Sequence, residues 1–194
     1  MTKAKQERTS IFGPGGKPGT IKDAPVNTVF VPQPYGAIVE RNGNGCTGIG
    51  TVGLATCWAP VLYTSTHIFV GHFDTREDEL ECLDAAIDRM RELNSGMDVS
   101  CVLVNTGHLP TLGAVEDLLR VRGVDYDPAQ NKKTLSDFYV TLTNPGNVKP
   151  CRDPGNVHNS ANFDAVRTAS DGNIYRLRRD NRSLHIKATN YQAP

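Results

Sequence analysis

One cysteine and one histidine are spaced so that they could perform nucleophilic catalysis together. Cys57 follows a glycine-rich run, and His72 comes fifteen residues later in the segment GHFD. The residues between them predict two strands, 61–63 and 67–73, joined by a tight turn, and an antiparallel hairpin brings such positions side by side. An imidazole next to a thiol can hold the proton while the thiolate attacks a carbonyl carbon. We therefore predict that the two side chains lie within about 4 Å of each other across adjacent strands.

The other histidines are weaker candidates. His67 is five residues from His72 on the same predicted strand, so the two face opposite sides of the sheet and only one can face Cys57. A metal site made from His67, His72 and Asp74 is disfavoured, because no third convergent ligand is evident. The three remaining histidines are expected to be solvated, namely His108, His158 and His185.

The remaining cysteines carry no recognisable chemistry. Five cysteines are scattered along the chain and never form a CxxC pair, which argues against a disulfide framework and against a zinc finger. Cys82 and Cys101 lie inside apolar patterns, so we expect them to be small core residues.

The glycine-rich run contains two overlapping GxGxxG matches, at 43–48 and 48–53. A dinucleotide site needs the last glycine to open a helix, but the continuation TVGLATCWAPVL is rich in β-branched residues and contains Pro60. The glycines are therefore expected to serve turns and bulges. No cofactor or metal is expected, because no site for one is recognisable.

The residues around the Cys–His pair resemble a known family. TVGLATC (51–57), a hydrophobic strand, GHFD and a long amphipathic helix follow one another as in the chemotaxis receptor glutamine deamidases. SCVLVNTGH and GAVEDLLRVRGVDY are similar to that family's next strand and helix, and FDAVRTASDGNIYRL to its closing hairpin. The resemblance covers 36–124 with fair continuity and the end of the chain more loosely. It has two departures: Thr56 replaces a serine, and DPAQNKKTL replaces a double-glycine stretch.

This resemblance implies a reaction. Cytotoxic necrotizing factor toxins have a similar catalytic Cys–His pair. The segments ATCWAPVL and GHFDT are also similar to the protein N-terminal asparagine amidohydrolases. All of them hydrolyse a carboxamide to a carboxylate and ammonia. Carried over to this chain, the resemblance implies Cys57 as nucleophile, His72 as general base and Thr51 as the residue that orients the imidazole.

The expected activity is that of a cofactor-free protein glutamine deamidase, acting as a toxin or effector or as a receptor-modifying enzyme. The expected partner is a protein that exposes a glutamine, or an asparagine. No charged residue lies within ten positions of Cys57, so ion-pair partners for free glutamine would have to come from elsewhere in the fold. The alternatives are an N-terminal asparagine amidohydrolase, a transglutaminase, a protease, and a non-catalytic binding protein on the same scaffold.

Hydrophobic periodicity predicts the elements that would position these residues. Apolar residues at intervals of three and four predict a helix that starts at Thr75 and closes at Gly96, and a second helix over 111–122. Between them, 100–106 is typical of a strand buried on both faces. The fold class is therefore α/β: a layered sandwich with a mixed, largely antiparallel β-sheet core and two amphipathic helices packed against it.

Further strands are expected at both ends of the chain. In the first half they are 28–31 and 35–40, and in the second half 138–143 is a strand, followed by a long loop over 144–162. A hairpin is expected between 163–169 and 174–179. Composition divides the chain into a flexible Pro/Gly-rich arm, 1–34, and one catalytic domain, 35–194.

Composition excludes several classes of protein. The 194 residues carry 21 basic and 21 acidic side chains, so the net charge is zero. That balance argues against broad electrostatic binding of nucleic acid or of anionic membranes. No run of about 18 apolar residues is present, and the opening MTKAKQERTS lacks the apolar core of a secretory signal. We expect a soluble monomer that is cytoplasmic, or exported into a host cell by a dedicated secretion system.

Overall fold

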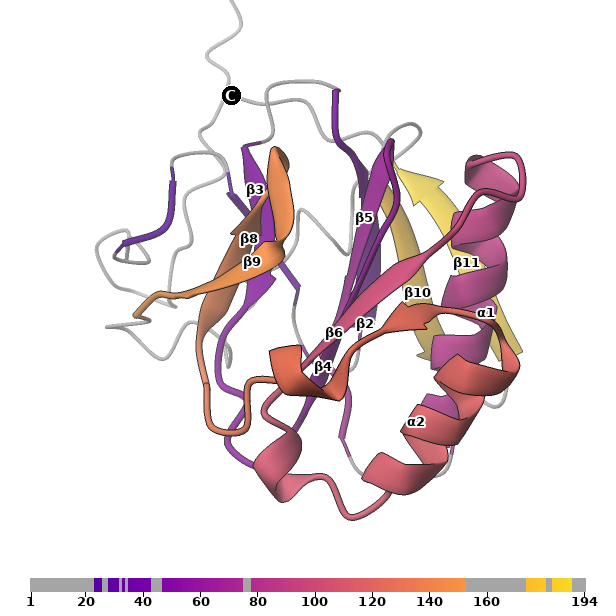
Figure 1. Ribbon diagram of the computed structural model, residues 1–194. Coiled ribbons are helices and arrows are strands. Elements are labelled where there is room, and N and C mark those ends of the chain that lie inside the picture. The colour runs from indigo at the N-terminus through magenta and orange to yellow at the C-terminus, as the bar shows by residue number, and fades with distance from the viewer. Residues whose placement is uncertain are drawn as a thin grey trace, which may run out of the picture.

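In the part of the chain that the structure describes, two β-sheets are stacked face to face and two helices cover the outer face of the larger sheet (Figure 1). The computed structural model describes residues 23–25, 28–31, 33, 35–42, 47–74, 78–152, 174–180 and 183–189. This architecture confirms the predicted α/β sandwich. Residues 1–22 of the predicted arm lie outside the described residues, and the division into arm and domain stays a prediction.

The larger sheet has seven strands in the order β11-β10-β2-β5-β4-β6-β7. Neighbouring strands are antiparallel except for the parallel pair β6 and β7. The strands are β2 (Tyr35–Glu40), β4 (Ala59–Tyr63), β5 (His67–Gly71), β6 (Ser100–Val104), β7 (Asp125–Tyr126), β10 (Ile174–Asp180) and β11 (Ser183–Thr189).

The smaller sheet has four strands in the order β1-β3-β8-β9, with β1 and β3 parallel and the other pairs antiparallel. Its strands are β1 (Thr28–Phe30), β3 (Gly48–Thr51), β8 (Phe138–Thr141) and β9 (Asn144–Pro150). The predicted strands near the N-terminal end of the chain are therefore present, and the first of them belongs to this smaller sheet.

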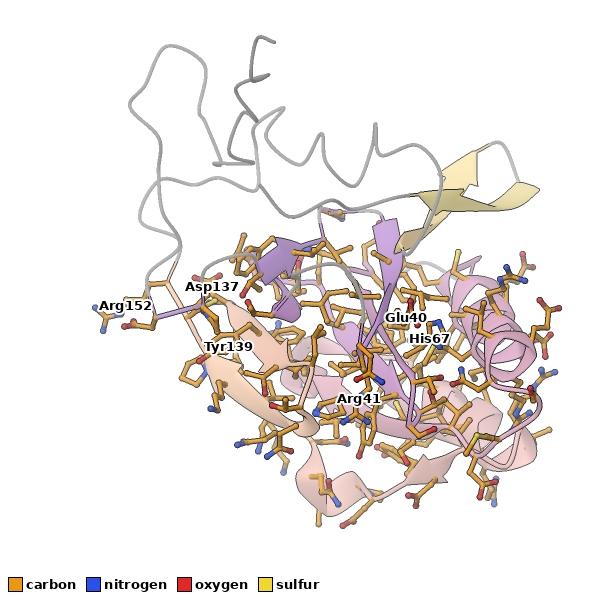
Figure 2. All side chains as sticks on the ribbon, turned by 90° about the horizontal axis from the view of Figure 1, so that it is seen from above. Glu40, Arg41, His67, Asp137, Tyr139 and Arg152 are labelled. Carbon is orange, nitrogen blue, oxygen red and sulfur yellow. The ribbon has the colours of Figure 1, made fainter. Side chains whose placement is uncertain are left out.

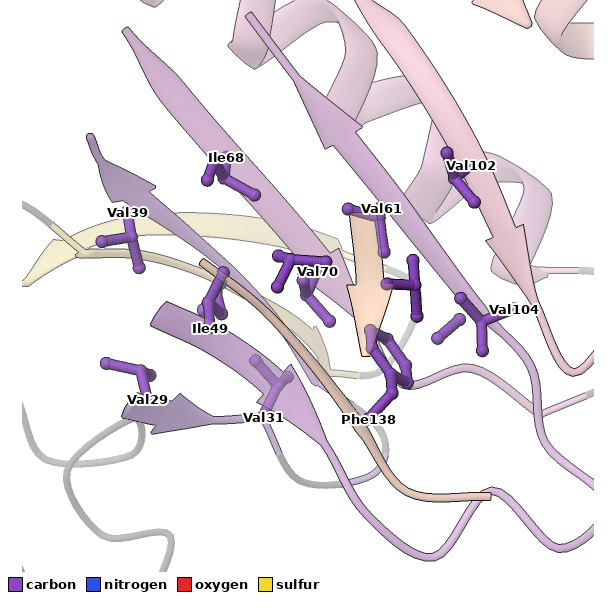
Figure 3. Close-up of a cluster of buried hydrophobic side chains, with 14 of the residues drawn as sticks. Val29, Val31, Val39, Ile49, Val61, Ile68, Val70, Val102, Val104 and Phe138 are labelled. Atoms are coloured by element: carbon purple, nitrogen blue, oxygen red, sulfur yellow. The ribbon is translucent and has the colours of Figure 1, made fainter. Parts of the chain in front are cut away.

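Aliphatic side chains fill the space between the sheets (Figure 3). β-branched residues suit this position, because their branched side chains pack well on a pleated surface. Burying each side chain contributes about 1.5–3 kcal/mol to the free energy of folding. This hydrophobic contribution is the main force that holds the sheets together. The fully buried members include Val31, Ile49, Val61, Val70, Val104 and Phe138.

Helix α1 (Asp78–Leu93) and helix α2 (Leu112–Val121) bury their apolar stripes against the other face of the larger sheet. α1 ends three residues before the predicted Gly96, and α2 ends one residue before the predicted 122. Gly96 and Gly123, which follow the two helices, adopt φ values of 78° and 60°, which favour glycine. The predicted N-cap Thr75 lies outside the described residues. The described residues also form two short 3-10 helices, Thr106–His108 and Pro128–Gln130.

The predicted loop over 144–162 is wrong in its first part, because residues 144–150 form β9. Prolines and glycine in NPGNVKP favoured a loop. Among the described strands it pairs with β8 alone, at the edge of the smaller sheet, where a proline that cannot donate a hydrogen bond is tolerated. Residues 153–162 lie outside the described residues.

The predicted hairpin between 163–169 and 174–179 is also wrong. β10 pairs with β11 on one side and with β2 on the other, so both of its edges are occupied. β10 therefore forms its hairpin with β11, a strand over 183–189 that the sequence did not predict. Residues 163–169 lie outside the described residues.

Two of the glycines in the glycine-rich run allow the strands of the smaller sheet to approach closely. A Cβ on Gly50 would lie 2.1 Å from the Phe138 carbonyl oxygen, and one on Gly48 would lie 2.7 Å from the Val140 carbonyl oxygen. The run forms β3 and leads into β4 without a helix, so it lacks the helix N-terminus that a dinucleotide site requires.

Arg41 joins the two sheets at one end of the sandwich. Its Nε donates to the Leu142 carbonyl oxygen of the smaller sheet's hairpin (2.7 Å), and one terminal nitrogen donates to the Thr64 carbonyl oxygen in the β4–β5 turn (2.9 Å). Figure 2 shows Arg41 near Glu40 and His67, which are paired in register across β2 and β5. Among the described residues, no helix has both the length and the apolar character needed to cross a membrane.

Candidate active site

Thr51 and His72 meet at the interface between the two sheets. Thr51 is the last residue of β3 in the smaller sheet, and His72 directly follows β5 in the larger sheet. Their side chains form a hydrogen bond of 2.7 Å between Thr51 Oγ1 and His72 Nδ1, and both residues are buried. The predicted contact between the Thr51 hydroxyl and the imidazole is therefore present.

A second bond of Thr51 assigns the protons in this contact. The Thr51 hydroxyl also lies 2.7 Å from the Val31 carbonyl oxygen, which can only accept. The single hydroxyl hydrogen is therefore donated to Val31, and Thr51 Oγ1 must accept from the Nδ1–H of His72. In the neutral imidazole this leaves Nε2 without a proton, which is the form that a general base needs.

Strand register places Cys57 on the same face as His72. Val61 lies opposite Val70 in β4 and β5, and the register continues to the bridge between Trp58 and Phe73. Cys57 is thus diagonal to His72, which is a distance of about 7–8 Å between backbones that side chains can span. The predicted hairpin is confirmed, and the sulfur–imidazole separation of about 4 Å stays a prediction.

Cys57 lies directly beneath the surface. It is 6 % exposed, whereas Ala55 and Thr56 immediately before it are exposed. Its side chain belongs to the apolar cluster between the sheets. A substrate would therefore have to extend a slender group toward the sulfur next to the exposed turn.

Backbone hydrogen bonds hold the turn that precedes the cysteine. Gly53, with φ of 78°, donates its N–H to Asp137 Oδ1 (2.8 Å), and Leu54 donates to the Ser136 carbonyl oxygen (3.0 Å). Ala55 donates to the Gly53 carbonyl oxygen (2.8 Å). Within the part of the chain that the structure describes, the N–H of Thr56 donates to no protein acceptor.

Asn105 is a residue of this site that sequence reasoning missed. It directly follows β6 and is 3 % exposed, and its Nδ2 donates both to the Leu54 carbonyl oxygen and to the Cys57 carbonyl oxygen, the latter at 2.8 Å. The predicted strand 100–106 ends at Val104, because Asn105 adopts the left-handed conformation. A polar residue at the end of an apolar strand is the signal that could have identified it.

His67 lies on the opposite face of the larger sheet, as predicted. Its Nδ1 is 2.9 Å from Thr66 Oγ1 and 3.4 Å from Asn94 Oδ1, at the C-terminal end of α1. It therefore cannot replace His72 beside Cys57. Among the described residues, no three His, Cys, Asp or Glu side chains form a group that could hold a metal ion.

Two of the other described cysteines, Cys82 and Cys101, have raised pKa values. Burial, together with the nearby carboxylates of Glu79 and Glu81, raises the pKa of the Cys82 thiol to about 11, and burial raises the pKa of Cys101 further. Both thiols are therefore protonated at neutral pH and unreactive. The prediction that they are small core residues is confirmed.

Trp58 packs locally rather than beside the sulfur. Its ring meets the Phe73 ring edge to face at a centroid distance of 5.4 Å, in the cluster under the helices. Its Nε1 donates to the Asp74 carbonyl oxygen (2.9 Å). The indole therefore lies on the face of the larger sheet opposite to Cys57.

The segment DPAQNKKTL, which departs from the family pattern, lies against the site. The Thr106 N–H donates to the Lys132 carbonyl oxygen (3.3 Å), and the Gly107 N–H donates to the Lys133 carbonyl oxygen (2.8 Å). Lys132 and Lys133 are exposed. The backbone of this segment therefore lies next to the residues that directly follow Asn105.

No protein family, curated protein or solved structure matches the chain in comparisons with known proteins.

Proposed function

We propose that this protein is a cysteine-dependent amidohydrolase that deamidates a glutamine side chain on a protein substrate. One observation carries the proposal. The Thr51 hydroxyl bonds both Val31 and His72, which leaves His72 Nε2 as the basic nitrogen on the sheet face that also carries Cys57. The resemblance of TVGLATC and GHFD to the receptor deamidases supports the same assignment.

In each half of the reaction His72 takes one proton and then returns one. The imidazole Nε2 takes the thiol proton while the Cys57 sulfur forms a bond to the carboxamide carbon, and the imidazolium then protonates the departing ammonia. The C–N bond breaks in that step and leaves a thioester. Nε2 then takes a proton from water while the water oxygen bonds to the thioester carbon, the C–S bond breaks, and the imidazolium returns its proton to the Cys57 sulfur. The balance is glutamine plus water to glutamate plus ammonia.

Stabilisation of the oxyanion falls to the turn before the nucleophile. Thr56 is an exposed residue and its N–H donates to no acceptor among the described residues, so this N–H is available to the oxygen of the carboxamide. One such donor is worth roughly 3 kcal/mol of transition-state stabilisation. The role of Thr51 is to hold the ring and its tautomer, and the charged form of His72 that develops keeps its Nδ1–H bond to Thr51.

A protein glutamine is favoured over free glutamine as substrate. The sulfur lies just beneath the surface, next to exposed Ala55 and Thr56, and a glutamine side chain on a partner's surface can extend into such a position. Free glutamine would need a cation and an anion held at set distances for its two charged ends. Ammonia release from free glutamine is measured in parallel to test this choice of substrate.

The test is mass spectrometry of a mixture of folded proteins and a library of glutamine peptides, each incubated with wild type and with Cys57→Ser. The proposal requires a Cys57-dependent gain of about one dalton at glutamine. Added hydroxylamine should trap the thioester as a hydroxamate at the same position. Cross-links would instead indicate transglutamination, cleaved peptides would indicate proteolysis, and gain at N-terminal asparagine alone would indicate the asparagine amidohydrolase activity. Binding without any of these would indicate a non-catalytic protein.

A further inference from the structure

A single buried amide reaches both ends of the turn that carries the nucleophile. Asn105 Nδ2 donates to the carbonyl oxygens of Leu54 and Cys57, and these two residues flank the exposed pair Ala55 and Thr56. The partners are separated by 51 and 48 positions in the chain, so the contact is a tertiary one. Both hydrogens of one NH₂ group are used on one short turn.

These bonds fix the peptide planes at both ends of the turn. The Leu54–Ala55 peptide is held through its carbonyl by Asn105 and through its N–H by the Gly53 carbonyl oxygen (2.8 Å). The Cys57–Trp58 peptide is held through its carbonyl by Asn105 and through its N–H by the Phe73 carbonyl oxygen (2.8 Å). Between the two fixed planes lie only the peptides whose N–H groups belong to Thr56 and Cys57.

Asn105 is itself held rigidly. Its φ of 60° and ψ of 37° lie in the left-handed region, which asparagine tolerates better than other side-chain-bearing residues. It follows the buried strand β6, and the next two N–H groups, of Thr106 and Gly107, bond the carbonyl oxygens of Lys132 and Lys133. A donor fixed in this way can define the position of the turn.

We propose that Asn105 is a positioning residue for Cys57, an inference that rests on the amidohydrolase function proposed above. Asn105 acts through the backbone of the turn: it fixes the sulfur relative to His72 and aims the turn's N–H groups at the carboxamide oxygen. It bonds the backbone on both sides of the nucleophile and makes no contact with the substrate. Its loss lowers the rate of the chemical step more than it weakens substrate binding, because misplacement of a reacting group by about 1 Å can cost on the order of 100-fold in rate.

The test uses two variants and a matched control. Asn105→Gly keeps the left-handed backbone but removes the amide, and Asn105→Asp keeps the shape but replaces two donors with acceptors. Asn94→Asp is the control. Asn94 is buried to a similar extent, at 4 % exposed, and its Nδ2 also donates to a carbonyl oxygen, that of Met90 (2.5 Å). Asn94 lies at the other end of the β4–β5 hairpin. The measurements are kcat and KM for a glutamine substrate, and the rate of Cys57 alkylation by iodoacetamide as a function of pH, with folding checked by circular dichroism.

Both Asn105 variants should lower kcat at least about tenfold with KM changed by less than about threefold, and should change the pH profile of Cys57 alkylation. Asn94→Asp should lower stability and leave that profile unchanged. If Asn105→Gly folds and keeps the wild-type kcat and alkylation profile, the inference about Asn105 is overturned and the proposed function is not affected. If wild-type Cys57 is no more reactive than Cys82 and no deamidation occurs, the proposed function fails as well. If neither Asn105 variant folds, the residue is structural and the inference is rejected.

Discussion

At the scale of single residues, the candidate site depends on one hydroxyl with two partners. Thr51 donates to Val31 and accepts from His72, so removing its oxygen leaves a buried carbonyl and a buried ring N–H without this partner. Each unsatisfied buried group costs roughly 1–3 kcal/mol. The hydroxyl therefore contributes to stability and to the tautomer of the base at the same time.

Thr51→Val should lower kcat strongly and the free energy of unfolding by about 1–3 kcal/mol, whereas Thr51→Ser should retain most of both, since it keeps the hydroxyl. Steady-state kinetics and urea denaturation measure the two effects. Wild-type turnover in Thr51→Val would remove this residue from the site.

The cysteines provide a second residue-scale prediction. Iodoacetamide at pH 7.5 should modify Cys57 at least about tenfold faster than Cys82, whose pKa of about 11 leaves well under about 1 % thiolate. Peptide mapping by mass spectrometry over a time course measures each rate. Equal rates would mean that His72 does not activate the Cys57 thiol.

At the scale of elements, the site requires that β3 and β8 lie unusually close. The Cβ position on Gly50 is 2.1 Å from a backbone oxygen of β8, and a backbone atom in a paired strand cannot move away cheaply. Thr51 is the next residue, so any separation of these strands also displaces the hydroxyl that orients His72.

Gly50→Ala should therefore lower the free energy of unfolding by more than about 2 kcal/mol and abolish activity. Gly113→Ala is the matched control: it lies in α2 with nothing within 4 Å of the new Cβ, and it should stabilise the protein by about 0.5–1 kcal/mol. Urea denaturation of both variants gives the comparison. An unchanged stability in Gly50→Ala would show that the two strands can separate at little cost.

At the scale of the whole molecule, burial of weak acids makes stability depend on pH in the alkaline range. Burial is the first cause of the raised pKa values of Cys82, Cys101 and Tyr126. A raised pKa in the folded state means that the unfolded chain releases its protons first as the pH increases. This contribution to stability is fully present below the unfolded pKa and is lost as the pH rises toward the folded value.

We expect the free energy of unfolding to be constant near pH 7–8 and to fall between about pH 9 and pH 11, the window from the ordinary thiol value of 9.0 to the value of about 11 for Cys82. Urea denaturation at about pH 7.5, 9 and 10.5 measures how the free energy of unfolding changes with pH. Cys82→Ala should reduce that slope. A stability that rises over this window would contradict the predicted direction.

Local patterns in the sequence determined the elements and the identity of the catalytic candidates. Repeats of 3.6 and 2 residues identified α1, α2 and the hairpin of β4 and β5, because those periods depend only on neighbouring residues. Alternation of side chains along the same hairpin also predicts that His72 and His67 lie on opposite faces of the sheet. The family resemblance added Thr51, whose hydroxyl does bond His72.

Long-range pairing is what only the tertiary structure decided. The sequence predicts a loop at β9 and no strand at β11, because a strand with prolines or mixed polarity is stabilised by its partner and not by its own pattern. Asn105 reaches the turn of Cys57 from 48 positions away, and Thr51 meets His72 only because two sheets stack. Contacts of this kind depend on where distant segments are placed, and a period of two or 3.6 residues carries no information about that placement.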